Sequence, residues 1–174
     1  MANLSDDRLL RISKAPKATI DAWREGISIE GTAGMTLSDI ACRVACDRWR
    51  LGSEHLAHAQ AQMRKRPKLN RAAVSRAYYG MYHFIRASTF IHFGGDDHEE
   101  HRKLPAAVPD DFPNRDVWSN ALKSAREHRN RADYDPYLTG SLSWLRMATD
   151  VVREAAALEI TSKTYLKTKG CIIP

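Results

Sequence analysis

Apolar residues recur at spacings of three and four along most of this 174-residue chain, and almost nowhere do they alternate with polar ones. The first pattern is that of a helix with one buried face, and the second is that of a strand. Breakers fall between the periodic stretches, at Pro67, at Gly94-Gly95 and at Pro136. The sequence therefore predicts an all-α fold, an antiparallel (up-and-down) bundle of four to five helices.

The breakers divide the chain into a peripheral segment (1–35), a bundle (36–168) and a short tail (169–174). In the peripheral segment we expect short helices at 5–13 and 18–25 and a loop at 26–35. In the bundle we expect helices at 36–64, 71–93, 114–133 and 141–167. Thr36 and Asp39 form a T-x-x-D capping box at the start of the first, in which Gly52 is a weak spot.

Composition limits the class of protein. The length suits one domain, and no run approaches the roughly 18 apolar residues that cross a membrane. The first residues form no apolar signal segment. An odd set of cysteines, Cys42, Cys46 and Cys171, then indicates reduced thiols packed in the core of a cytoplasmic protein. No metal site and no cofactor are expected, because no ligands stand at a suitable spacing.

The net charge of +6 is concentrated in MRKRPKLNR, residues 63–71, which suits phosphates or is simply a solvated connection. In the loop 96–101, His98 and His101 stand among carboxylates that could bind a metal, although a solvated loop is the simpler interpretation. Tryptophan side chains are interpreted as core or helix-packing residues: Trp23, Trp49, Trp118 and Trp144.

The predicted helix at 71–93 carries two stripes. The first is expected to lie in the core and contains Val74, Tyr78, Met81, Ile85 and Thr89. The second mixes cations, an imidazole and aromatic rings: Arg76, Tyr79, His83, Arg86 and Phe90. It could be a wet surface or the wall of a site. We interpret it first as a self-association face and expect a homodimer.

The densest polar cluster is REHRNRADYDPY, residues 126–137, at the end of a predicted helix. Four of its side chains share one helical face: Arg126, Arg129, Asn130 and Asp133. We expect these groups to be free to meet an RNA, a nucleotide or a partner chain. The structural alternative is a surface pair between Arg129 and Asp133. Tyr134 and Tyr137 are expected to pack the following turn against the last helix.

Two segments together resemble HEPN domains. SRAYYGMYH, residues 75–83, is similar to the second helix of that family, and R-x-x-R-N-x-A-D-Y, residues 126–134, resembles the end of its third helix. The resemblance covers roughly residues 36–167. It implies an up-and-down helical homodimer, and in many members a metal-independent ribonuclease. It also implies a toxin–antitoxin or defence module whose partner is a minimal nucleotidyltransferase.

The resemblance also assigns roles to residues. It makes Arg126, Arg129, Asn130 and Asp133 the catalytic group. It places Arg76, Tyr79 and His83 beside that group across the dimer. The residues expected to bind RNA or a partner are these three with Arg86 and Tyr134. Tyr134 matches a position that can be modified.

Active members of the family carry R-x4–6-H, because an imidazole can move a proton and an arginine can stabilise charge on a phosphate. This chain departs from that pattern, since no histidine follows Arg126, Arg129 or Arg131 at the required distance. His83 and His128 remain as substitute proton carriers. The pattern also occurs on other helices, where chance explains it: Arg50–His55, Arg76–His83 and Arg86–His92. A non-catalytic HEPN subunit that binds a partner or a nucleotide is therefore the alternative.

Overall fold

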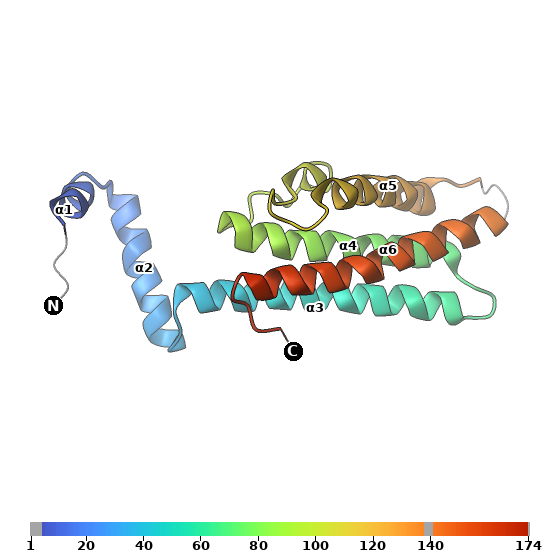
Figure 1. Cartoon of the computed structure of the whole chain (residues 1–174), viewed down its shortest axis with the longest axis horizontal. Coiled ribbons are helices and arrows are strands. Elements are labelled where there is room, and N and C mark those ends of the chain that lie inside the picture. Colours follow the sequence, from blue (N-terminus) through green and yellow to red (C-terminus); the bar gives the residue numbers. More distant parts are fainter. Residues whose placement is uncertain (1–4, 138–140, 174) are drawn as a thin grey trace. The chain divides into compact units, whose positions relative to one another are not determined.

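The computed structural model describes residues 5–137 and 141–173, and this part of the chain is helical with no strand. Its α-helices are α1 (Asp6–Ser13), α2 (Lys17–Ala33), α3 (Leu37–Arg64), α4 (Asn70–Phe93), α5 (Arg115–Tyr134) and α6 (Ser141–Thr168), with a short 3₁₀ helix, η1 (Leu104–Ala107), before α5 (Figure 1). The all-α prediction is confirmed. The chain forms two compact units, Met1–Ile40 and Ala41–Pro174.

In the first unit, α2 continues to Ala33, so the loop predicted at 26–35 is wrong. Gly26 lies inside the helix, where a Cβ would lie 3.1 Å from Leu37 Cδ1, so the glycine leaves room for the side chain of Leu37. The helix stops at Gly34, whose φ of 62° is the left-handed conformation that glycine adopts readily. No described residue of α1 or α2 is buried, and Trp23 is exposed rather than in a core.

The start of α3 follows the predicted capping box. Thr36 Oγ1 accepts the backbone N–H of Asp39 at 3.1 Å and donates to Asp39 Oδ2 at 2.7 Å. The backbone N–H of Thr36 also points at that carboxylate, 3.4 Å away. These bonds satisfy N–H groups that a helix terminus otherwise leaves unpaired, and they fix the first helical residue at Leu37.

In the second unit, the helices from α3 to α6 run alternately in opposite directions, with α4 in the middle (Figure 1). The stripe of α4 predicted to be buried is buried throughout: Val74, Tyr78, Met81, Ile85 and Thr89. Three of the four tryptophans, Trp49, Trp118 and Trp144, are buried as predicted. No described helix is both long and apolar enough to cross a membrane.

Gly52 is a contact point between helices rather than a weak spot in α3. A Cβ on Gly52 would lie 2.7 Å from the ring of Phe84, and one on Gly80 would lie 3.1 Å from the carbonyl oxygen of Gly52. The two glycines therefore allow α3 and α4 to approach backbone to backbone, which a side chain at either position would prevent.

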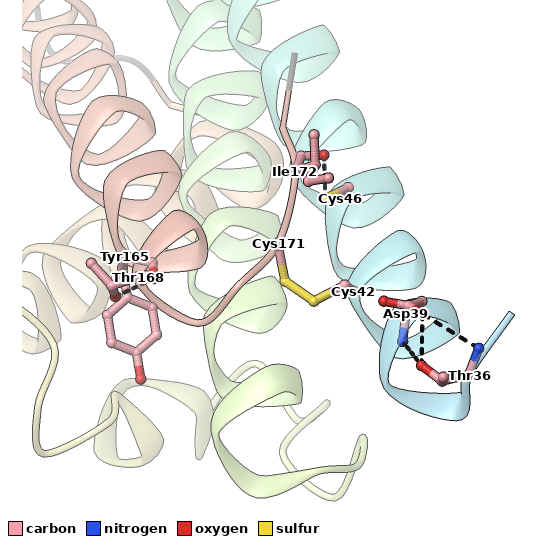
Figure 2. The surroundings of a disulfide bond; sticks show 8 residues. All are labelled: Thr36, Asp39, Cys42, Cys46, Tyr165, Thr168, Cys171 and Ile172. Carbon is pink, nitrogen blue, oxygen red and sulfur yellow. Dashed lines mark hydrogen bonds between the residues drawn. A yellow bond between two sulfur atoms is a disulfide. The ribbon is translucent and has the colours of Figure 1, made fainter.

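The cysteines correct a second expectation. Cys42 of α3 and Cys171 after α6 form a disulfide, with their Cα atoms 5.0 Å apart, and Cys46 is a buried thiol (Figure 2). The expectation of three reduced thiols is wrong in this structure. The reason is the chain reversal after α6, where Gly170 has a φ of 87° and the N–H of Cys171 donates to Leu166 O at 3.0 Å. The bonded cysteines are 129 residues apart, so their spacing in the sequence does not reveal the pairing.

Candidate functional site

Arg129 is the centre of the polar cluster on α5. Its guanidinium donates a hydrogen bond to the Tyr79 hydroxyl and lies 5.2 Å from the centroid of that ring. Another N–H donates to Asn130 Oδ1 at 3.1 Å. Nε lies 3.0 Å from Asp133 Oδ2, an ion pair without the alignment of a hydrogen bond. The side chain is 17 % exposed, so Arg129 is bound within the chain rather than free to meet a partner.

Asp133 makes a second contact between this cluster and α4. Its Oδ2 accepts a hydrogen bond from Ser75 Oγ at 3.3 Å. The segment 75–83 of α4 and the segment 126–134 of α5 therefore touch at two points, through Tyr79 with Arg129 and through Ser75 with Asp133. These are the two segments that carry the resemblance described above. The resemblance places Tyr79 beside the Arg129 group across a dimer, whereas the fold brings the two residues together within one chain.

A pocket of about 580 Å³ opens beside this contact. It is lined by residues of α3, α4 and α5: His55, Ala72, Ser75, Arg76, Tyr79, His83 and Asp133. The ring of His55 is stacked on that of Tyr79, with centroids 5.5 Å apart, and on that of His83, 5.4 Å apart. The wall therefore presents a run of three rings with a guanidinium beside it, which can contact both a planar group and an anion.

Both imidazoles of the pocket are held neutral near pH 7. Burial and the neighbouring guanidinium of Arg76 lower the pKa of His55. Burial, with His55, Arg86 and Arg48 as further causes, lowers the pKa of His83 to about 4. Arg76 donates toward His55 Nδ1 at 3.4 Å, which leaves the proton of the neutral ring on Nε2. Such rings can accept a proton, and an approaching anion would make them more basic.

The loop after α4 contributes a second imidazole cluster. His101 Nδ1 is 2.7 Å from the hydroxyl of Tyr78, and its ring is stacked on Tyr82 with centroids 4.1 Å apart. Arg126 points a guanidinium N–H at the backbone carbonyl of His101, 3.5 Å away, and its Nε is buried without a partner. Burial, followed by Arg129, lowers the pKa of His101. Arg126 therefore holds the loop against α5.

The mixed stripe of α4 is divided by these contacts. Arg76, Tyr79 and His83 line the pocket, whereas the other two members bind within the chain. Arg86 and Arg48 both hold Asp96, and the guanidinium of Arg48 lies 4.7 Å from the ring centroid of Phe90. The hydrogen bond from Arg86 holds the pKa of Asp96 well below its usual range. Of the stripe that we expect to form a self-association face, only Arg76, Tyr79 and His83 thus remain beside an opening.

The remaining predicted residues lie outside the pocket. Tyr134 and Tyr137 are 71 % and 91 % exposed, so the prediction that they pack against the last helix is wrong. Tyr134 does lie over Arg129, with the guanidinium 5.7 Å from its ring centroid. The charged neighbours of His128 are on its own helix and on α6, not in the pocket. Within the described ranges no group of side chains is arranged to hold a metal ion.

The basic connection between α3 and α4 has two parts. Arg71 donates to the carbonyl oxygens of Ala132 at 2.6 Å and Asp135 at 2.9 Å, and so caps the end of α5. Its other cations are exposed: Arg64, Lys65, Arg66 and Lys68. These exposed residues lie at the pocket end of the bundle, and they are the part of the connection that is accessible to an anion.

Two functional candidates were missed in the sequence, His55 and His101. His55 follows Arg50 in an R-x4–6-H pattern. In the structure, however, Arg50 pairs with Asp47 at 2.6 Å, and it is Arg76 that donates toward the imidazole of His55. His101 was noticed only as a possible metal ligand. The chemistry that this arrangement supports is the binding of an anion between a guanidinium and neutral imidazoles, which can also accept a proton. Comparison with protein-family models and with curated proteins finds no match for this chain.

Proposed function

We propose that this protein is an RNA-directed helical bundle of the HEPN type, which acts as a homodimer in a toxin–antitoxin or defence module. The observation that carries the proposal is the pocket in which Arg76, His55 and His83 lie beside Tyr79. A phosphodiester needs a cation to bind its oxygens, and cleavage beside a 2′-hydroxyl needs groups that move protons. The contact between the two HEPN-like segments, Tyr79 with Arg129, supports the same assignment.

The test is RNA binding and cleavage by matched variants. Arg76→Ala removes the guanidinium on the pocket wall, and we expect its affinity for a single-stranded RNA oligonucleotide to fall about tenfold at fixed salt. Arg50→Ala is the control, because it removes the same charge from an exposed pair with Asp47. Equal affinities for the two variants would exclude the pocket as the RNA site.

Cleavage is expected to persist in EDTA, because the proposed chemistry uses imidazoles rather than a metal. His55→Asn and His83→Asn should each reduce the cleavage rate while leaving binding nearly unchanged. Loss of activity on chelation, restored by Mg²⁺ or Mn²⁺, would contradict this mechanism. An unaltered rate in both histidine variants would do the same.

The second candidate is a non-catalytic HEPN subunit that binds a partner, such as a minimal nucleotidyltransferase, or a nucleotide. The observation that favours it is Arg129, which is 17 % exposed and bound to Tyr79, Asn130 and Asp133. The family's ribonuclease pattern is also absent from that helix. Expression with and without the adjacent gene, scored for growth arrest and RNA cleavage, separates the two candidates. Growth arrest that depends on Arg76 favours the first.

The proposed homodimer is tested by its mass in solution. Light scattering at micromolar concentration should give about twice 19.7 kDa. A monomer of 19.7 kDa would contradict self-association through the exposed part of α4.

A further inference from the structure

The tail after α6 covers part of the core. Past the chain reversal, Cys171 is 3 % exposed, Ile172 is 91 % exposed and Ile173 is 4 % exposed. This alternation is that of an extended segment with one face buried. Lys169 Nζ is 2.5 Å from Asp111 Oδ2, which fixes the start of the tail. The tail therefore packs as an extended segment over one end of the bundle.

The disulfide joins the two ends of the compact unit. That unit begins at Ala41, within α3, so Cys42 is close to its first residue and Cys171 is close to its last. In Figure 2 the tail runs along α3 from the disulfide toward Cys46. The tail is thus joined to α3 by one covalent bond, and Ile173 beyond it is buried in the core cluster.

The third cysteine lies against the same tail. Cys46 is one helical turn beyond Cys42, on the same face of α3. Its Sγ is 3.6 Å from the carbonyl oxygen of Ile172, and the residue is buried. Burial raises the pKa of the Cys46 thiol, which keeps it protonated and unreactive while the tail is in place.

We propose that the Cys42–Cys171 disulfide is a redox-controlled fastener, whose reduction releases the tail from α3 and makes the Cys46 thiol reactive. The reductant is a dithiol. It gives two electrons and two protons to the sulfur–sulfur bond, which breaks into two thiols, and the dithiol is oxidised to a disulfide. Release of the tail exposes Cys46 because the Ile172 carbonyl and the neighbouring buried residues leave with it. This inference does not depend on the proposed RNA site.

The experiment measures alkylation of Cys46 by N-ethylmaleimide, resolved by peptide mass spectrometry. In the oxidised protein Cys46 should react slowly. With dithiothreitol added and then removed, or in the Cys42→Ser/Cys171→Ser variant without reductant, its rate should rise by about tenfold or more, as for a locally opened segment. A Cys46→Ser variant confirms the assignment of the modified peptide.

Hydrogen exchange on the same samples separates local release from unfolding. We expect amides of residues 169–173 to lose their protection, whereas those of residues 77–89 in α4 should lose no more protection than the fall in the free energy of unfolding of the same samples requires. A Cys46 rate that is unchanged by reduction would overturn the proposal. So would a rise in the Cys46 rate no larger than the loss of protection in α4, because Cys46 would then react through unfolding of the whole unit rather than through release of the tail.

Discussion

The two ends of the bundle use polar residues in opposite ways. At the end where the tail lies, Asp111 accepts from Tyr165 at 2.8 Å and from Lys169 at 2.5 Å, and a disulfide closes the chain. At the pocket end, Arg129 and Asp133 are bound between helices, but Arg76 still faces an open pocket. A closed polar network stabilises a fold, whereas polar groups left beside an opening are available to a ligand.

We expect the largest loss of stability from removing the disulfide at the tail end of the bundle. Cys42→Ser/Cys171→Ser removes a cross-link between residues 129 positions apart, and we expect the free energy of unfolding to fall by about 3 kcal/mol. The reason is the larger conformational freedom of the unfolded chain without the cross-link. Urea unfolding of the variant and of the oxidised parent measures it. Coincident unfolding curves would mean that the disulfide adds nothing to stability.

The next effect tests whether the pocket end is also structural. Arg129→Ala removes three polar contacts of a side chain that is mostly buried, so we expect a loss of about 2 kcal/mol in unfolding free energy. The matched control is Arg131→Ala on the same helix. Arg131 also pairs with an aspartate four residues on, at 3.8 Å, but is 53 % exposed. Its loss should cost less than about 0.5 kcal/mol.

Melting curves of these two variants decide the role of Arg129. Equal melting temperatures would show that the contacts of Arg129 contribute no more than an exposed pair. In that case Arg129 would again be a candidate for contacting RNA, as the sequence predicts.

The difference between the ends also shows what a sequence can predict. Helical spacing located α3 to α6 to within a residue or two, because each has a long apolar stripe and a breaker after it. It fails at α2, where the sequence predicts a loop from Gly26 onward but the glycine lies inside a helix, in close contact with Leu37. Local patterns predict elements well, but the packing between elements decides how a glycine is used.

The site was predictable only within one helix. Spacing correctly grouped Arg129 with Asp133, since residues four apart share a face. It could not show that Tyr79 and Ser75 bind these two residues from α4, or that His55 of α3 completes the pocket wall. Nor did it reveal the disulfide, whose partners meet only through the fold. Contacts between distant segments carry no local signature.

A third prediction concerns pH and the pocket end. The pKa of His83 is lowered to about 4, whereas in the unfolded chain it is about 6.5. Below pH 6.5 the unfolded state therefore binds more protons, and stability should fall progressively down to about pH 4. The groups around it that oppose its protonation are the guanidiniums of Arg48 on α3 and Arg86 on α4, and the imidazoles of His55 on α3 and His101 in the loop. Because His83 retains some contact with water, we expect the loss to be on the order of 1 kcal/mol.

The measurement is urea unfolding at a series of pH values between about 4 and 7, for the parent and for His83→Asn. The variant should show a shallower fall over this range, because it lacks the ring that the unfolded state protonates. Parallel profiles for the two proteins would assign the pH dependence to other groups.

A small effect is expected at the tail end, from Lys169→Ala. The lost contacts are an ion pair with Asp111, whose side chain is half exposed, and a cation–π contact in which Lys169 Nζ lies 5.1 Å from the ring centroid of Tyr165. Asp111 keeps its hydrogen bond from Tyr165. No buried charge is left without a partner, so the loss of stability should stay under about 1 kcal/mol and should shrink in high salt. The variant should also leave Cys46 as slow to alkylate as in the oxidised parent, because the disulfide still holds the tail. Rapid alkylation of Cys46 in Lys169→Ala would mean that the ion pair, not the disulfide, keeps this end of the bundle closed.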